Sequence, residues 1–182
     1  MAHDLIDRIK AYLDATGNRP RFEVASPETI QRAEARLGFS LPSFLKRCYI
    51  EIANGGFGPA HGLFGIENGH RSDWGDIVDF YQVIERDYKS EGRIWTPALL
   101  PFCEYGCAIF WCVKCDSSVQ ICTLDQGKVW PQDYGLETFF EMWLKGVDIY
   151  TSDPTIETVE STWINPFRRR EETIRTLRRR DG

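Results

Sequence analysis

The sequence lacks the features that place a protein in a membrane or mark it for export. Its longest unbroken apolar run, residues 108–113, has six residues, whereas a membrane-spanning helix needs about 20. The first seven residues already include two aspartates, and no apolar stretch follows a basic start. We therefore expect no secretory signal, a cytoplasmic location and no binding to membranes.

The six cysteines lack the spacing that is typical of a structural zinc site. Such sites usually join two CxxC pairs, and this chain has one, Cys112 and Cys115. These two end an apolar segment in which strand alternation points them to opposite faces, and no helix that would lower a thiol pKa is expected after Cys115. We predict reduced thiols that fill a core, without cofactor or metal. A metal site remains the alternative for the cluster Cys103, Cys107, Cys112, Cys115 and Cys122; Cys48 lies apart.

Signatures of catalysis and phosphate binding are also missing. The glycine-rich residues 54–58 follow a predicted helix and lack a Lys-Ser/Thr pair, whereas a phosphate loop follows a strand and opens a helix. The chain has three histidines, His3, His61 and His70. One is near the start and two lie in the glycine-rich segment, so we interpret them as solvent-exposed rather than as partners of a catalytic cysteine. The sequence therefore predicts a protein that is not an enzyme.

What is present is the composition of an ordinary globular protein. The 182 residues are 42% hydrophobic and 27% charged, enough for one domain that needs no disulfide or metal. The net charge is −5; residues 164–182 carry seven arginines against three acids, a net of +4, which leaves −9 for residues 1–163. An acidic body argues against nucleic acid as the ligand and favours a basic protein partner.

Hydrophobic periodicity predicts helices in the first half of the chain. Apolar stripes with a period of 3.6 residues mark helices over residues 4–15, 27–37, 43–52 and 73–89. The second helix has clear end signals. Ser26 suits the N-cap, Pro27 the first helical position, and Gly38 the left-handed position after the end.

The second half predicts an antiparallel sheet. Short apolar runs over residues 98–102, 108–113, 119–124 and 128–130 are separated by turn residues, among them the three-residue connection Asp125-Gln126-Gly127. A helix over residues 137–145 would cover one face. We predict an α+β fold, an antiparallel meander with helices packed on one side. Residues 1–146 form this domain, and residues 147–182 form a basic extension, expected to be helical from Asn165-Pro166 onward.

One block of the sequence resembles the signature of the SUKH (Smi/Knr-like) superfamily, "E-x-x-L-G-x-x-L-P" followed by a helix and "N-G-G". The matching residues are Glu34, Leu37-Gly38, Leu41-Pro42 and Asn54-Gly55-Gly56. The resemblance extends over about residues 22–146 and departs from the family pattern at residues 103–107. It implies the fold predicted above and a protein-binding role. Members include a fungal regulator of cell-wall synthesis and bacterial immunity proteins that neutralise toxin domains, often nucleases or deaminases.

Acidic residues supply the candidate partner-binding site. Asp73, Asp76 and Asp79 are spaced three residues apart in the predicted helix and would form one negative stripe. Glu104 and Asp116, in the predicted sheet turns, would extend it. Such charges speed association with a basic partner, although a solvated helix face is the alternative interpretation.

The sequence therefore predicts an immunity protein that neutralises a cognate toxin domain by direct binding. Two alternatives stay open. One is a regulatory or scaffolding protein that binds a cellular partner, and the other is a metal protein that uses the cysteine cluster.

Overall fold

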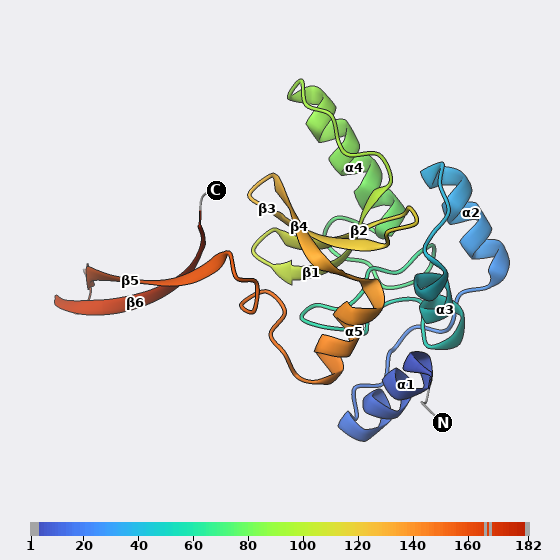
Figure 1. Cartoon of the computed structure of the whole chain (residues 1–182), viewed down its shortest axis with the longest axis horizontal. Coiled ribbons are helices and arrows are strands. Elements are labelled where there is room, and N and C mark those ends of the chain that lie inside the picture. Colours follow the sequence, from blue (N-terminus) through green and yellow to red (C-terminus); the bar gives the residue numbers. More distant parts are fainter. Residues whose placement is uncertain (1–3, 166, 168, 181–182) are drawn as a thin grey trace. The chain divides into compact units, whose positions relative to one another are not determined.

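The computed structural model describes residues 4–165, 167 and 169–180. The chain divides into two compact units, residues 1–145 and 146–182. The first contains α1 (Leu5–Thr16), α2 (Pro27–Leu37), α3 (Ser43–Glu51), α4 (Ile77–Ser90), β1 (Leu99–Gly106), β2 (Ile109–Lys114), β3 (Gln120–Asp125), β4 (Lys128–Gly135) and α5 (Leu136–Leu144) (Figure 1). Within the described residues, no helix combines the length and the apolarity that a membrane crossing requires. His3, Pro166 and Arg168 lie outside the described residues.

The predicted end signals of α2 are confirmed. The Ser26 hydroxyl accepts a hydrogen bond from the N–H of Thr29 at 3.2 Å, Pro27 occupies the first turn, and Gly38 is left-handed with φ of 81°. A residue with a Cβ is strained at that φ. Glycine therefore ends the helix at this position without strain.

The carboxylate of Glu34 connects α2 to α3. It accepts hydrogen bonds from the N–H of Leu41 at 2.7 Å and from the ammonium group of Lys46 at 3.1 Å. The first of these bonds satisfies a backbone donor in the turn between the helices, and Leu41 itself is buried. Glu34 and Leu41 of the signature block thus have a structural role in the turn that joins α2 to α3.

The α+β class and the antiparallel meander are both confirmed. The strands follow the order β1-β2-β3-β4, and each pairs with its neighbour in the sequence. The turn between β3 and β4 is shorter than predicted, because Asp125 pairs with Lys128. Only Gln126 and Gly127 lie between them, with φ of 49° and 70°. Two successive positive φ values are typical of the two-residue hairpin turn that matches the twist of the strands.

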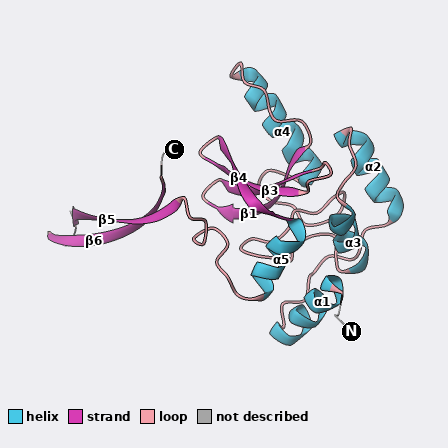
Figure 2. Cartoon of the chain, in the orientation of Figure 1, coloured by secondary structure: helices cyan, strands magenta, loops and turns pink. Residues whose placement is uncertain are grey.

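Helices cover both faces of this sheet, rather than the one face expected from the sequence (Figure 2). Phe110 and Trp111 are neighbours in β2, so their side chains point to opposite faces. The ring of Phe110 lies 4.7 Å from that of Phe80 in α4, and the ring of Trp111 lies 5.1 Å from that of Phe139 in α5. Because β2 is apolar at successive positions, both its faces need a cover, and α4 and α5 each supply one.

A buried asparagine organises the glycine-rich segment between α3 and α4. The side-chain oxygen of Asn54 accepts from the N–H of Ile66 at 2.8 Å, and its amide group donates to the carbonyl of Glu67 at 3.0 Å. The glycines around it leave room for this amide, since a Cβ on Gly69 would lie 2.4 Å from the Asn54 side chain and one on Gly65 would lie 2.5 Å from the Asn54 carbonyl oxygen. The segment is therefore a compact loop built around one side chain.

The second unit is a β-hairpin, so the predicted C-terminal helix is wrong. Strand β5 (Ile156–Asn165) pairs with β6 (Arg170–Arg179) in antiparallel register. Strand β5 is rich in threonine, valine and isoleucine, which favour strands, and β6 adds two threonines and one isoleucine. The spacing of the apolar residues does not by itself separate strand from helix, since Ile174 and Leu177 are three residues apart. The unit is not basic either, because its seven arginines are balanced by seven acids.

We predict that replacing Asn54 with alanine lowers the free energy of unfolding by about 2–4 kcal/mol, because two buried backbone groups lose their partner. Urea unfolding followed by tryptophan fluorescence measures this change. The control is Gln82→Ala, which removes an exposed amide from α4 and should alter stability by less than about 0.5 kcal/mol. Equal losses in the two variants would contradict the role assigned to Asn54.

Candidate functional site

The three aspartates predicted to form one negative stripe do not form it. Asp76 is the N-cap of α4; it is 3% exposed, and its carboxylate accepts hydrogen bonds from two backbone N–H groups of the first turn, at 2.9 Å each. Asp79 forms ion pairs with Arg36 at 2.9 Å and Arg71 at 2.8 Å. Asp73 is exposed but precedes the helix. The stripe is absent because α4 begins four residues later than predicted.

The other two predicted acids lie at opposite ends of the β1–β2 ladder. Glu104 pairs with Phe110 at one end. At the other end the N–H of Cys115, next to Asp116, donates to the carbonyl of Ala98. About five residues of strand, roughly 17 Å, separate the two ends. The structure therefore does not bring the five acids together, and their part in partner binding stays a prediction.

The cysteines are free thiols placed mainly in the core. Four of them, Cys48, Cys103, Cys112 and Cys122, are at most 1% exposed. Burial raises the pKa of each of these thiols, and it raises the pKa of the half-buried Cys115 to about 12. A thiol that stays protonated at neutral pH is neither a nucleophile nor a ready metal ligand. In the described part of the chain, no three His, Cys, Asp or Glu side chains are grouped to hold a metal ion.

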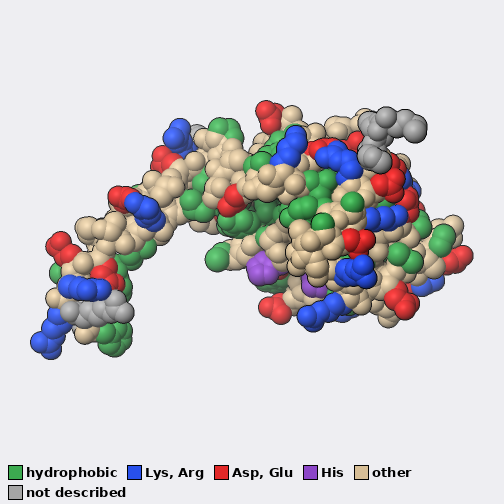
Figure 3. Space-filling model, turned by 90° about the horizontal axis from the view of Figure 1, so that it is seen from below, with side chains coloured by type: hydrophobic (Ala, Val, Ile, Leu, Met, Phe, Trp, Pro, Cys, Tyr) green, Lys and Arg blue, Asp and Glu red, His purple; other side chains and the backbone are tan. Residues whose placement is uncertain are grey.

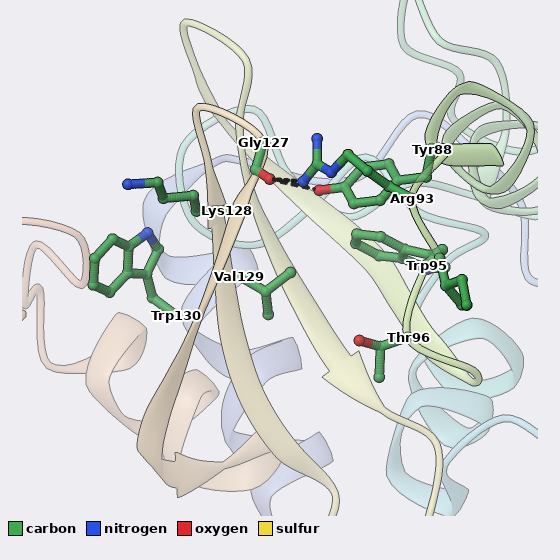
Figure 4. A pocket seen from close by; sticks show the side chains of 9 residues that line it. Tyr88, Arg93, Trp95, Thr96, Gly127, Lys128, Val129 and Trp130 are labelled. Carbon is green, nitrogen blue, oxygen red and sulfur yellow. Dashed lines mark hydrogen bonds between the residues drawn. The ribbon is translucent and has the colours of Figure 1, made fainter. Parts of the chain in front are cut away.

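A cleft of about 390 Å³ lies where the end of α4 meets the β3–β4 turn (Figure 4). We call it the Arg93 cleft, and its main side chains are Tyr88, Arg93, Ile94, Trp95 and Val129. In the close-up, the Val129 side chain points toward Trp95, whereas Lys128 and Trp130 point to the other side of the strand. Thr96, Lys128 and Trp130 also border the cleft, so its lining combines aromatic and aliphatic groups with a hydroxyl, a guanidinium and an ammonium group.

Hydrogen bonds fix the aromatic wall of the Arg93 cleft in place. The hydroxyl of Tyr88 donates to the carbonyl of Gly127 at 2.8 Å, and the guanidinium of Arg93 donates to the same oxygen. That guanidinium also lies 4.0 Å from the centre of the Tyr88 ring. Trp95 contacts Tyr88 edge to face at 4.9 Å, and its indole N–H donates to the carbonyl of Leu99 at 2.9 Å. These contacts hold the side chains in one arrangement before any ligand binds.

Among the described residues of the first unit, Ile94 is the most exposed large apolar side chain. It is 90% exposed and stands between Arg93, at the edge of the cleft, and the buried Trp95. Tyrosine, tryptophan and arginine are the residues most enriched at the energetic centres of protein interfaces. An exposed isoleucine beside such a cluster offers apolar area to a partner, so the arrangement suits the binding of a protein surface.

A second cleft, of about 700 Å³, differs in chemistry. Its lining includes Arg19, Arg21, His61 and His70, and the described residues that line it include no aspartate or glutamate. Figure 3 shows both described histidines on one face of the molecule with lysine or arginine side chains beside them. His61 is exposed, as predicted, but His70 is half-buried. Burial lowers the pKa of His70, and the nearby His61 lowers it further.

Nothing in the local sequence distinguishes Arg93 and Ile94 from other surface residues. Ile94 and its neighbour Trp95 lie in the short stretch between α4 and β1, outside any helical or strand period. A single exposed isoleucine is common on protein surfaces and signals nothing by itself. Ile94 becomes a candidate for partner binding only because the fold places it beside the aromatic wall of Tyr88 and Trp95.

Comparison with models of protein families identifies the family of this chain. The model of the SMI1 / KNR4 family (SUKH-1) matches residues 24–146, more than half of the chain. These residues contain α2 to α5 and the four-stranded sheet, and they include the Arg93 cleft. No curated protein matches the chain.

We predict that the cysteines differ in reactivity according to their burial. With an excess of an aromatic disulfide reagent at neutral pH, the exposed Cys107 should react at once. Cys48, Cys103 and Cys112 should react only when the protein unfolds, because burial both shields them and raises their pKa. Absorbance of the released thiolate measures the rate, and Cys107→Ser should remove the fast phase. A fast phase of several thiols in the native protein would contradict this account.

Proposed function

Because the chain belongs to the SMI1 / KNR4 family (SUKH-1), we propose that it is an immunity protein that binds a bacterial toxin domain and blocks its activity without catalysis of its own. The observation that carries this proposal is the Arg93 cleft, an aromatic wall with an exposed isoleucine at its side. Ile94 would enter the toxin surface, and the wall formed by Tyr88 and Trp95, with Arg93 held at its edge, would receive an apolar side chain of the toxin.

The rigidity of the Arg93 cleft supports tight binding. Association is weakened by the ordering of side chains at an interface, by about 0.5–1.5 kcal/mol for each flexible side chain. Here Tyr88 and Arg93 are already held on the carbonyl of Gly127, so little ordering remains to be done. Burial of Ile94, which is 90% exposed, contributes about 1.5–3 kcal/mol. The cleft therefore offers a preformed anchor of the kind that dominates interface energies.

The charge of the first unit supports a basic partner. Residues 1–145 carry 15 lysines and arginines against 20 aspartates and glutamates. A net negative unit attracts a basic toxin domain at a distance and raises the rate of association, an effect that salt weakens. The exposed acids Asp73 and Asp116 would add to this attraction, although the two do not form one patch. In this proposal, charge guides the encounter and the Arg93 cleft holds the complex.

We predict that Ile94→Asp weakens toxin binding about 100-fold, equivalent to about 2.7 kcal/mol, because a charge replaces the apolar group at the interface. The purified chain serves as bait for toxin domains from cells of its own source, which are identified by mass spectrometry. The captured domain is then expressed alone and with each variant, and cell growth is recorded.

The wild-type chain should restore growth and Ile94→Asp should fail to do so. The matched control is Val24→Asp, which changes another exposed apolar residue, 53% exposed and outside the Arg93 cleft, and should protect as well as wild type. Capture of a cellular regulator with no toxic activity would overturn the immunity role and favour the regulatory alternative. Equal protection by Ile94→Asp and wild type would show that the cleft is not the binding site.

A further inference from the structure

The C-terminal hairpin is unusually rich in exposed apolar groups. Among the described residues, six of the ten large hydrophobic side chains that are exposed lie in residues 146–182, a fifth of the chain. They are Val147, Trp163, Ile164, Phe167, Ile174 and Leu177. A two-stranded hairpin is only marginally stable in water, and clustered apolar exposure marks an interaction surface. The hairpin therefore has the properties of an element that another surface covers.

The base of the hairpin is well fixed within its own unit. The guanidinium of Arg179 forms an ion pair with Asp153 at 2.7 Å, and these side chains are only 6% and 5% exposed. The same guanidinium donates to the hydroxyl of Thr155 and lies 5.7 Å from the centre of the Tyr150 ring. These contacts hold β6 to the segment that leads into β5. Of the exposed apolar groups, all but Val147 lie beyond this anchor, in the strands or in the turn between them.

One face of the hairpin carries a continuous apolar patch. Val159, Ser161 and Trp163 alternate along β5 and share a face. Ser161 pairs directly with Ile174 of β6, so Ile174 lies diagonally beside both Val159 and Trp163. Trp163 is 42% exposed and Ile174 is 37% exposed. The patch reaches the outer edge of β5, which has no neighbouring strand in this two-stranded sheet.

The two edges of the hairpin differ in charge. Strand β6 carries four arginines in ten residues, and β5 carries none. Long charged side chains along an edge discourage the pairing of further strands. The acids of β5 are already engaged, Glu160 with Arg175 at 2.7 Å and Glu157 with Arg180 at 3.1 Å. The edge of β5 is thus the one that is open to another strand.

We propose that β5 pairs with β5 of a second copy of this chain, so that two hairpins form one four-stranded antiparallel sheet in the order β6-β5-β5-β6. A two-fold axis passes between the two Ser161 residues. In this register, Val159 of each chain lies opposite Trp163 of the other, a β-branched and an aromatic residue, which favour one another across strands. The apolar patches of the two hairpins then join into one surface.

The charges of β5 fit this symmetric pairing. Around the same axis Glu160 lies opposite Thr162 of the second copy, and Thr158 lies opposite Ile164, so no acid faces an acid. A two-fold interface uses the same surface on both chains, which only a self-complementary strand allows. In this sheet, the backbone N–H and C=O groups of β5 that point away from β6 also form hydrogen bonds with the second copy. The sequence of β5 therefore favours a second copy of this chain, rather than an unrelated strand, as the partner of this edge.

The register predicts a specific cross-link. In a Cys107→Ser background, which removes the exposed native thiol, Ser161→Cys places two cysteines opposite each other across the axis. Paired residues in antiparallel strands have Cα atoms about 4.5–5.5 Å apart, within the range of about 4.4–6.8 Å that a disulfide spans. Mild oxidation should convert most of this variant to a covalent dimer on a non-reducing gel.

The matched control is Thr173→Cys in the same background. Thr173 is exposed on β6, and in the proposed sheet three strand spacings alone separate its two copies by about 14 Å, so it should stay uncross-linked. Sedimentation of the wild-type chain should give twice the 21.0 kDa chain mass. A monomer at every concentration would overturn the proposal. A dimer in which Thr173→Cys cross-links as well as Ser161→Cys, or in which neither does, would overturn the β5 pairing. The purified chain alone is used, so the outcome is independent of toxin binding.

Discussion

The buried amide of Asn54 is the interaction on which the arrangement of the first unit depends. It holds the backbone of Ile66 and Glu67, and the loop around it forms hydrogen bonds with both β1 and α4. The N–H of Phe64 donates to the carbonyl of Phe102 in β1, and the N–H of Ile77, the first residue of α4, donates to the carbonyl of Gly65. One side chain thus sets the position of α4 relative to the edge of the sheet.

The position of α4 in turn determines the Arg93 cleft. The helix packs on the sheet through Phe80 and Phe110, and its last turn brings Tyr88 to the carbonyl of Gly127 in the β3–β4 turn. That carbonyl is accessible because the turn has only two residues and a left-handed glycine. The cleft is therefore a consequence of two local features, an asparagine-centred loop at one end of α4 and a tight turn at the other. The turn itself borders the cleft through Gly127, whereas the asparagine-centred loop acts on it only through α4.

The sequence predicted those parts of the fold whose signals are local. Helix caps such as Ser26 and Gly38, and the alternation of apolar runs in the sheet, depend on nearest neighbours and were recognised. The acidic stripe was wrong because Asp76, assigned to the helix interior, is the N-cap, and this placement follows from the loop at residues 54–70.

The C-terminal helix was wrong because Asn165-Pro166 and the arginines suit a helix start and a basic face as well as they suit a strand and a turn. The cross-strand pairing of Glu160 with Arg175 becomes visible only in the folded hairpin. The cleft was missed because its residues come from two separate segments.

The proposed role of the Arg93 cleft, as the surface that holds a partner protein, can be tested by hydrogen–deuterium exchange of the chain, free and in complex with a captured toxin domain. The partner should slow amide exchange in residues 88–96 and 127–130, with little change at α1 or at residues 73–79. Protection confined to other surfaces, with residues 88–96 exchanging as fast as in the free protein, would contradict it.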